Sequence, residues 1–524
     1  MGIYLNPGNS NYRETTNMDM YVDKTGMLSV VNGLVDGSNK YICMSRPRRF
    51  GKTIAQNMIA SYYSRGCDSH ELFDSLKISG DPDYEKYLNK YNVIKIDLNS
   101  EYQNTRDKDS FLVSLQTKIN KEMAKEYPGI GFEEKDTLAE AIMKVYDACG
   151  DTFIILIDEY DVLVREQVPQ KLFDEFLSFL NGLFKSDTLR PAISLAYLTG
   201  ILPIVRDKIQ SKLNNFEEYT MLDAGDFAEY VGFITDEVKY LCAENNMDYE
   251  QCRRWYDGYA QNGYEIYNPE SVVKSMRKHK YAGYWSKTSS YQVISDRLKQ
   301  NFKGTGDDVI RMLSGERVDV NVSGYLNTMD GFETKDDVFT YLIHLGYLAY
   351  DDEEGTCRIP NGEVRQEWFN AVAANRDYEA TDEIIRQSKS LLDATLKGDE
   401  EAVAKALDVS HMHVASNRNY NNEDVFQSAI YLAYIYALNK YLVIKEMTSG
   451  KGFADVVFIP YTADLPAMVI ELKHNKTADS ALTRIRDKKY FDSLDVFTGE
   501  VLLVGVNYDE TTKEHTCRIE RITK

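Results

Sequence analysis

The chain has 524 residues, more than one hydrophobic core can organise, so its length predicts several domains. Hydrophobic residues make up 43% of it and charged residues 27%, which excludes a disordered or fibrous chain. The formal net charge of -21 excludes non-specific adhesion to nucleic acid, because an acidic surface repels phosphate backbones. Any nucleic-acid contact must therefore be local, and residues 471–524, where ten basic side chains balance ten acidic ones, leave room for one.

The cysteines and the N-terminal segment exclude further classes of protein. Seven scattered cysteines without a CxxC pair do not form the pattern of a disulfide framework or a zinc site. The opening MGIYLNPGNS lacks a secretory signal, and no apolar run approaches the roughly 20 residues of a membrane span. We therefore expect a cytoplasmic protein without a membrane partner.

Two stretches of the chain show strand patterns. Between Tyr41 and about Asn215, the short apolar runs YICM, NVIKIDL, TFIILI and ISLAYLTGI alternate with longer mixed segments, as is typical of a parallel α/β sheet. From Asp223 to about Arg386 the pattern is mostly helical. Within it, the sequence of residues 338–350 predicts a helix that leads into a small hairpin, as in a winged-helix-like element. From about Asn421 we expect a helix at 425–438, strands YLVIKE, ADVVFIP and AMVIELK, a helix at 479–494 and a strand EVLLVGVN.

A phosphate-binding motif follows the first strand directly. In such a loop, backbone N–H groups and a helix N-terminus surround phosphates, a lysine reaches the β and γ oxygens, and Ser or Thr binds Mg. Gly51, Lys52 and Thr53 fit these roles, whereas Arg46 stands where GxxxxGK[ST] has its first glycine. The predicted nucleotide-binding residues are Arg46, Pro47, Arg48, Arg49, Phe50, Gly51, Lys52, Thr53 and Asp158.

Acids at the end of the strand FIILI complete this predicted site. Asp158 is placed to orient the water shell of a Mg ion that Thr53 also binds, and Glu159 to polarise the attacking water. Thr199, at the end of ISLAYLTGI, is placed to sense the γ-phosphate. ATP and Mg are therefore the expected cofactors.

The C-terminal strands carry a second set of acids with a lysine. Side chains alternate along a strand, so Glu471 and Lys473 share one face, and the neighbouring strand can place Asp455 beside them. Carboxylates bind Mg, which activates water for phosphodiester hydrolysis, while the lysine orients that water. We expect Asp455, Glu471 and Lys473 to be catalytic, with a surface pair on a sheet edge as the alternative.

The N-terminal motifs resemble the bacterial AAA-ATPase-like family. The family's loop is typically RPRRFGK[ST], which matches RPRRFGKT here with Arg46 included, and YVDKT, IDEYD, TGI, WYDGY, YNP and IPN match further positions up to about residue 370. Members often carry a C-terminal PD-(D/E)XK nuclease domain, and the last part of this chain resembles that fold. The resemblance implies Glu423 as an upstream metal ligand beside Asp455 and Glu471.

Two positions depart from that nuclease pattern. Phe453 stands where relatives often have Arg, and Arg484 in ALTRI stands where ALxQI often has Gln. These departures put substrate orientation and rate in question but leave the metal-binding acids in place.

The sequence thus predicts an α/β protein with a P-loop NTPase parallel sheet (1–220), a helical lid and middle region (221–395) and a small restriction-endonuclease-like α/β domain (396–524). Its expected function is ATP binding and hydrolysis that control a Mg-dependent nuclease, in defence or nucleic-acid processing, with DNA favoured over RNA as partner. The alternatives are a nucleotide-dependent switch or binding module with an inactive nuclease-like domain, and two relic sites on a scaffold. The sequence also leaves a homo-oligomer possible, because Arg48, Arg49 or Arg206 could complete the ATP site of a neighbouring subunit.

Overall fold

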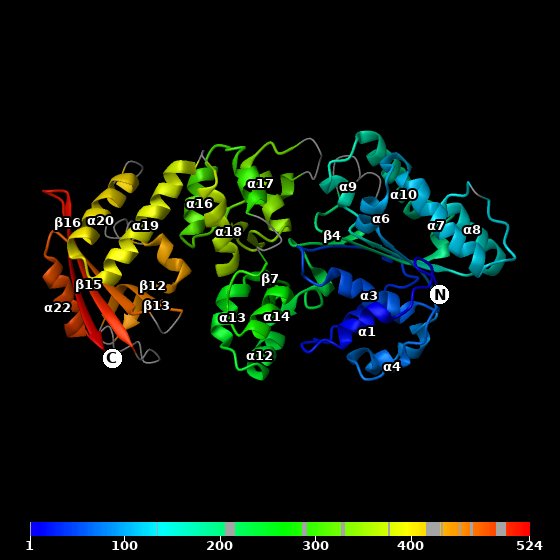
Figure 1. The fold of residues 1–524 in the computed structure, drawn as a ribbon, viewed down its shortest axis with the longest axis horizontal. Coiled ribbons are helices and arrows are strands. Elements are labelled where there is room, and N and C mark those ends of the chain that lie inside the picture. The colour runs from blue at the N-terminus through cyan, green and yellow to red at the C-terminus, as the bar shows by residue number, and fades with distance from the viewer. Residues whose placement is uncertain are drawn as a thin grey trace. The chain divides into compact units, whose positions relative to one another are not determined.

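The computed structural model describes residues 2–133, 135–204, 215–285, 291–325, 331–375, 378–415, 430, 433–449, 452–461, 465–488 and 499–523 (Figure 1). The chain forms two compact units, Met1–Trp285 with Asp319–Asn361, and Ser286–Val318 with Gly362–Lys524. The domain limits at residues 220 and 395 stay predictions.

A five-stranded parallel sheet organises the first unit. Its strands are β1 (Tyr41–Ser45), β2 (Asn92–Asp97), β3 (Phe153–Asp158), β4 (Ile193–Gly200) and β5 (Glu217–Tyr219), in the order β2-β3-β4-β1-β5. This arrangement confirms the predicted α/β fold class and its four apolar strands. Because β4 lies between β1 and β3, its carboxyl end lies between the loop after β1 and the acids after β3.

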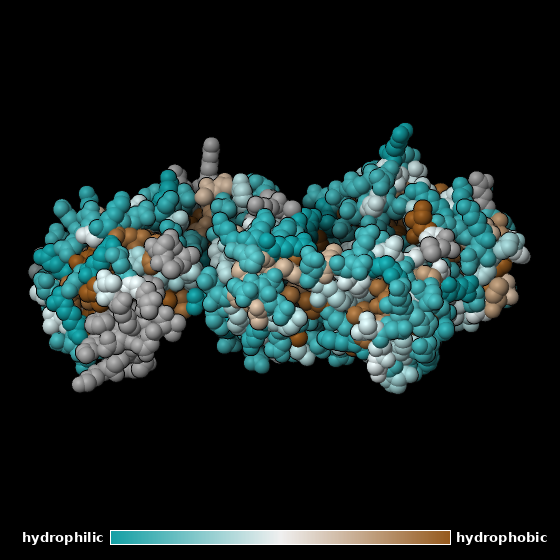
Figure 2. Space-filling model, turned by 60° about the horizontal axis from the view of Figure 1, so that its bottom comes forward, coloured by the Kyte–Doolittle hydropathy of each residue, from teal (hydrophilic) through white to brown (hydrophobic). Residues whose placement is uncertain are grey.

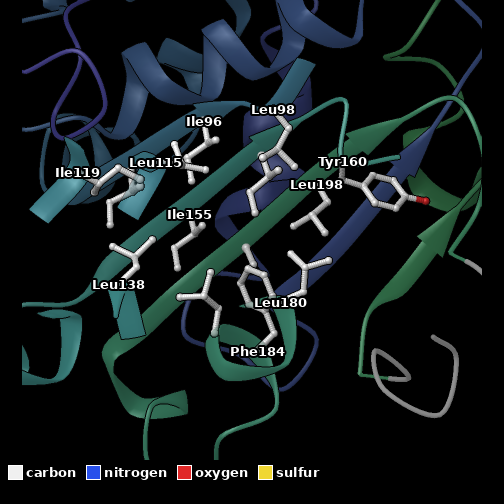
Figure 3. Packing of buried hydrophobic residues seen from close by; sticks show 14 of the residues in the cluster. Ile96, Leu98, Leu115, Ile119, Leu138, Ile155, Tyr160, Leu180, Phe184 and Leu198 are labelled. Carbon is white, nitrogen blue, oxygen red and sulfur yellow. The ribbon is translucent and has the colours of Figure 1, made fainter. Parts of the chain in front are cut away.

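Helices cover both faces of this sheet and explain why its strands are apolar throughout. They are α1 (Ser10–Thr16), α2 (Gly26–Asn32), α3 (Lys52–Tyr63), α4 (His70–Phe73), α5 (Tyr84–Tyr87), α6 (Leu98–Asn104), α7 (Phe111–Glu126), α8 (Leu138–Cys149), α9 (Val162–Arg165) and α10 (Gln170–Phe184). On one face, Ile155 of β3 packs in a buried cluster with Leu115 of α7 and Leu180 of α10 (Figure 3). On the other face, α3 contacts β2, β3 and β4. Burial on both faces favours continuous apolar runs over alternating ones.

The rest of the first unit is helical with two small sheets. Its helices are α12 (Thr235–Glu244), α13 (Tyr249–Tyr256), α14 (Pro269–Lys278) and α17 (Lys335–His344). The strands β6 (Phe233–Ile234), β7 (Tyr259–Gln261) and β8 (Tyr264–Tyr267) form one sheet, and β9 (Val318–Asp319), β10 (Ala349–Asp351) and β11 (Thr356–Arg358) the other. Helix α17 and the antiparallel pair β10–β11 confirm the predicted helix and hairpin. The winged-helix-like interpretation stays a prediction.

A mixed sheet organises the second unit. Its strands are β12 (Tyr441–Ser449), β13 (Gly452–Pro460), β14 (Ala467–His474), β15 (Glu500–Asp509) and β16 (Glu514–Thr523), paired in chain order and antiparallel except for β14–β15. The helices are α15 (Gln292–Leu298), α16 (Thr305–Leu313), α18 (Gly362–Ala373), α19 (Glu379–Lys397), α20 (Glu400–Ala415) and α22 (Ala478–Lys488). The predicted strands are confirmed. The predicted helix at 425–438 lies largely outside the described residues, and Ile435–Asn439 forms a 3-10 helix.

Two separate clusters form the core of this sheet. Val456, Phe458 and Ile470 belong to the cluster that also contains Leu392 of α19 and Leu407 of α20. On β14, Ala467 and Val469 instead join Leu482 and Ile485 of α22. Because side chains alternate along a strand, Glu471 and Lys473 share the face of β14 that α22 covers.

His515 of β16 makes the stability of the second unit depend on pH. Its Nδ1 lies 2.8 Å from Asp408 Oδ1 of α20, and burial lowers the pKa of His515. Because the pKa of His515 is lower in the folded chain than in the unfolded chain, where it is about 6.5, stability falls as pH decreases from about 6.5. We expect the melting temperature of the full chain to fall between about pH 7 and 5, and less steeply in His515→Gln. The exposed His474→Gln is the control, and equal slopes in all three proteins would contradict the expectation.

The surface carries no large apolar region on the face that Figure 2 shows, where hydrophilic residues predominate and hydrophobic ones form small, separate patches. The large apolar side chains that are most exposed, Ile3 (79%), Val113 (67%) and Tyr240 (64%), lie far apart in the sequence. Among the described residues, no helix combines the length and the hydropathy needed to cross a membrane.

Candidate functional site

The loop between β1 and α3 folds around its own lysine. Gly51 has φ 89° and Arg49 φ 70°, and α3 begins at Lys52, so the chain turns sharply into the helix. Lys52 Nζ donates hydrogen bonds of 2.8 Å to the carbonyl oxygens of both Arg46 and Pro47. Burial lowers the pKa of Lys52 to about 8, and nearby Asp158 opposes that shift. The loop thus encloses a buried cation that no carboxylate contacts directly among the described residues.

Asp158 joins the three segments that the sequence predicted to meet. Thr53 Oγ1, at the start of α3, donates to Asp158 Oδ2 at 2.7 Å, and Thr199 Oγ1 of β4 donates to Oδ1 of the same carboxylate. Asp158 itself is only 4% exposed. Hydroxyl and carboxylate oxygens are hard ligands of the kind that Mg prefers, so this set fits a Mg ion. The assigned roles of these residues stay predictions.

Glu159 has an unusual backbone and an ion-pair partner that the sequence did not indicate. Its φ is 52°, a conformation that residues other than glycine adopt mainly at turns and functional sites. Arg165 Nη2 lies 2.6 Å from Glu159 Oε2, and Arg165 Nε lies 3.2 Å from Asp161 Oδ2. Asp161 also accepts the backbone N–H groups of residues 201 and 202, both at 3.0 Å. The i,i+4 spacing of Asp161 and Arg165 was the one signal that could have indicated this arrangement.

Most other side chains of the loop face the protein. Arg46 is fully buried, and its Nη1 donates to the carbonyl oxygens of Ser45 at 2.9 Å and Tyr219 at 3.3 Å. Burial lowers the pKa of Arg46 to about 10. Pro47 and Phe50 are also buried, whereas Arg48 is exposed. These three buried residues therefore offer a ligand mainly their backbone. Arg206 lies outside the described residues.

In the second unit, the predicted acids and lysine lie together where two strands separate. The antiparallel pairing of β13 with β14 reaches Val456 and Ile470, and beyond it Asp455 Oδ2 accepts the backbone N–H of Leu472 at 2.7 Å. Glu471, fully buried, receives Lys473 Nζ at 2.6 Å from its Oε1. The carboxylate of Asp455 thus lies beside the segment that carries Glu471 and Lys473.

Helix α22 adds a second cation to Glu471. Arg484 Nε lies 2.9 Å from Glu471 Oε1, the same oxygen that Lys473 contacts. Burial raises the pKa of Glu471, and the negative charge of Asp455 raises it further. Glu471 Oε2 is buried without a hydrogen-bond partner among the described residues, so one oxygen remains for a metal ion.

The third acid of the predicted metal site cannot be placed. Glu423 and the side chain of Phe453 lie outside the described residues. Within the described part of the chain, His, Cys, Asp and Glu residues form no group of three or more that is suited to a metal ion. The two carboxylates of Asp455 and Glu471 therefore fit a divalent cation as part of its ligand set, and the upstream ligand stays a prediction.

Comparisons with known proteins agree with this division of sites. Residues 8–210 match the family model described as predicted AAA-ATPase, and residues 421–516 match that of the PD-(D/E)XK nuclease superfamily. The uncharacterized protein in the vnfD 5′ region of Azotobacter chroococcum mcd 1 is 22% identical over 517 residues, which cover 94% of this chain and 93% of that protein.

Two solved structures also align over much of the chain. One is the replication initiator DnaA bound to AMPPCP and single-stranded DNA, with 11% identity, coverage of 72% of this chain and 92% of that one, and a TM-score of 0.25. The other is the Aeropyrum pernix ORC1 protein in complex with DNA, with 9% identity, coverage of 94% and 100%, and a TM-score of 0.25. The two family models match the two ends of the chain that carry the phosphate loop and the acidic strands. The chain therefore contains an AAA-ATPase-like domain in residues 8–210 and a domain of the PD-(D/E)XK nuclease superfamily in residues 421–516.

Proposed function

We propose that the N-terminal domain binds and hydrolyses ATP with Mg, and that its nucleotide state controls a Mg-dependent nuclease at the C-terminus. The observation that carries the proposal is the shared use of Asp158 by Thr53 and Thr199 directly beside Lys52. A hydroxyl from the loop helix, an acid from β3 and a hydroxyl from β4 meet there. These are the groups that phosphoryl transfer needs around a nucleotide.

Each residue of this site has a definite task in the proposal. Lys52 leaves the two loop carbonyls and donates to the β and γ oxygens of ATP, while Thr53 and Asp158 hold the Mg ion. An ion held by Thr53 and Asp158 would supply positive charge beside the phosphates during transfer of the γ-phosphoryl group. Glu159 orients the attacking water. Before the nucleotide binds, the ion pair with Arg165 holds the carboxylate of Glu159 in place. Thr199 connects β4 to the same acid.

In the C-terminal domain, Asp455 and Glu471 would hold the metal and Lys473 would orient the attacking water. A bound Mg ion lowers the pKa of water and polarises the phosphodiester. The buried Oε2 of Glu471 supports this role, because an oxygen without a hydrogen-bond donor can accept a cation at little cost. DNA is the favoured substrate and RNA the second one to test.

Cleavage assays on the full chain test the proposal. Single- and double-stranded DNA and RNA are incubated with Mg or Mn, with and without ATP. We expect metal-dependent cleavage whose rate changes at least severalfold with ATP. Cleavage at the same rate with and without ATP would contradict the proposed control of the nuclease by the nucleotide, while the nuclease activity itself would be supported. Absence of cleavage under every condition would favour the second candidate function.

That second candidate is a nucleotide-dependent switch whose nuclease-like domain binds nucleic acid or a partner without cutting it. Arg484 favours it, because two cations already share one oxygen of Glu471 and compete with a metal ion. Nucleic acid retained by the chain without any Mg-dependent product would support this function.

Replacing Arg484 by glutamine is expected to tighten Mn binding to the C-terminal domain by about threefold to tenfold. Hydrogen bonds to charged groups contribute about 1.5–3 kcal/mol, and solvent reduces this value at a half-exposed arginine. Isothermal titration of the full chain with Mn, with nucleotide absent, measures the change. Arg486→Gln on the same helix is the matched control, because Arg486 pairs with Glu520 and not with Glu471. Equal affinities in the two variants would show that Arg484 does not compete with the metal.

A further inference from the structure

The tip of the phosphate loop is held by residues that lie far along the chain. The Phe50 ring is 1% exposed and meets the Tyr259 ring edge-on, with centroids 5.6 Å apart at 79°. Gly232, with φ 114°, lies against the same phenylalanine, and a methyl group there would be 3.4 Å from Phe50 Cδ1 and 2.4 Å from Ile266 Cγ2. Because glycine has no side chain, position 232 leaves room for the side chains of Phe50 and Ile266.

Two other loop residues have partners in the same region. Pro47 lies against Gly346, where a methyl group would come within 2.7 Å of Pro47 Cγ, and Tyr259 Oη donates to the Gly346 carbonyl oxygen at 2.5 Å. Arg49 Nη1 forms an ion pair of 2.8 Å with Glu270 Oε1. We call these partners the loop socket, which comprises Gly232, Tyr259, Ile266, Glu270 and Gly346.

The loop socket is built by sequence motifs to which the ATP site gives no role. Tyr259 closes WYDGY, and Asn268 of YNP caps α14 by accepting the Ser271 N–H at 3.2 Å, which places Glu270 in the first turn of that helix. Asn361 of IPN donates from Nδ2 to the Asp257 carbonyl oxygen at 2.7 Å and so fixes the segment before β7. Three motifs that are separated in sequence thus support one surface around the loop tip.

A nucleotide that draws Lys52 to both its β and γ oxygens would disturb the contacts that now hold the loop, because only one of the three ammonium N–H groups is not already used by the loop carbonyls. Lys52 donates to the carbonyl oxygens of Arg46 and Pro47, and it cannot bond phosphates along those same directions. When phosphates attract Lys52 and the loop N–H groups, these carbonyls lose their donor and the loop tip must adjust. Packed protein contacts pass such shifts on, because closely packed side chains leave little free space.

We propose that the loop socket senses the nucleotide, with Phe50 and Arg49 as the positioning residues that carry the change from the loop into β7, β8 and α14. The proposal rests on the ATP binding proposed above. Its path continues along the chain, since Arg358 Nη2 donates to the Gly258 carbonyl oxygen at 3.1 Å and Asn361 directly precedes Gly362, where the second unit resumes. The residue before Tyr259 is therefore hydrogen-bonded to the chain segment that leads into the second unit.

Hydrogen–deuterium exchange on the full chain, with and without ATP and Mg, tests both steps at once. We expect ATP to slow exchange in residues 46–53 and to change it at least twofold in residues 257–267. Protection of 46–53 without any change in 257–267 would overturn the socket proposal alone. If neither segment responds, ATP binding fails and the socket proposal fails with it.

A pair of matched variants separates sensing from mere support of the fold. Glu270→Gln removes the Arg49 ion pair together with the Lys274 ion pair on the same carboxylate oxygen, whereas Glu265→Gln removes an acid that pairs with Arg253 instead. We expect Glu270→Gln to reduce the ATP-dependent change in 257–267 at least twofold while 46–53 stays protected, and Glu265→Gln to behave like the wild type. An unaltered response in Glu270→Gln would overturn the role of Arg49. Tyr259→Leu, which removes the ring beside Phe50, tests the Phe50 contact by the same measurement.

Discussion

Replacing Asp455 by asparagine is expected to lower metal-dependent cleavage by about a hundredfold or more. A metal ligand that stabilises transition-state charge contributes several kcal/mol, and each 1.36 kcal/mol corresponds to a factor of ten in rate. Asparagine is the informative substitution, because its side-chain oxygen can still accept the Leu472 N–H that Asp455 accepts at 2.7 Å. Alanine would leave that N–H without an acceptor at a cost of about 1–3 kcal/mol, so it would mix stability with activity.

Asp487→Asn is the control for this loss, since Asp487 is an exposed acid on α22 of the same unit. Cleavage rates at saturating Mg, together with the melting temperature of each variant, provide the comparison. If Asp455→Asn keeps more than a tenth of the wild-type rate, Asp455 is not a metal ligand and the proposed nuclease site is wrong. Lys473→Met should also lose cleavage but keep Mn binding, because the lysine orients water and does not hold the ion.

The buried strands were predictable from sequence because of how they are covered. The residues of β1, β3 and β4 are buried throughout, which produces continuous apolar runs that any reader of the sequence can find. Strands β5 and β16 carry no such signal. Strand β5 has only three residues, one exposed and two partly exposed, and β16 mixes charged, polar and apolar side chains. The other two edge strands of these sheets, β2 and β12, do carry apolar runs and were predicted, so the missing signal lies in the composition of β5 and β16.

The site was predictable for the residues that end strands and not for their partners. Asp158, Thr199 and Lys52 could be brought together because parallel strands end at one edge. The partner of Glu159 and the second cation on Glu471 come from helices, and the approach of Arg484 depends on how α22 crosses its sheet. The spacing of residues along the chain does not predict the angle at which this helix crosses the sheet. The same holds for the loop socket, whose members lie about 180 to 300 residues after the loop.

Replacing Lys52 by methionine is expected to weaken ATP binding and hydrolysis by about thirtyfold to several thousandfold. Removal of one partner from a buried, hydrogen-bonded charge pair costs about 2–5 kcal/mol, and the phosphates of ATP would supply the other partner. Equilibrium binding of ATP and steady-state hydrolysis measure the two effects. Lys40→Met is the matched control, because Lys40 is also buried and donates to the Arg190 carbonyl oxygen at the opposite end of β1.

The same variant has a different expected effect on the stability of the free protein. Lys52 has a pKa of about 8 in the folded chain, below its usual value of 10.5, so below pH 8 the folded state carries a buried charge that the unfolded state keeps in water. Stability of the wild type therefore rises with pH between about 8 and 10.5, by up to about 3 kcal/mol, and Lys52→Met should lack this rise. At pH 7 without ATP, the removal of this buried charge offsets the two hydrogen bonds that methionine cannot donate, so Lys52→Met should melt close to the wild-type temperature. A variant that loses both ATP binding and stability would show that Lys52 supports the fold of the loop, and the loss of binding would then say nothing about phosphate contact.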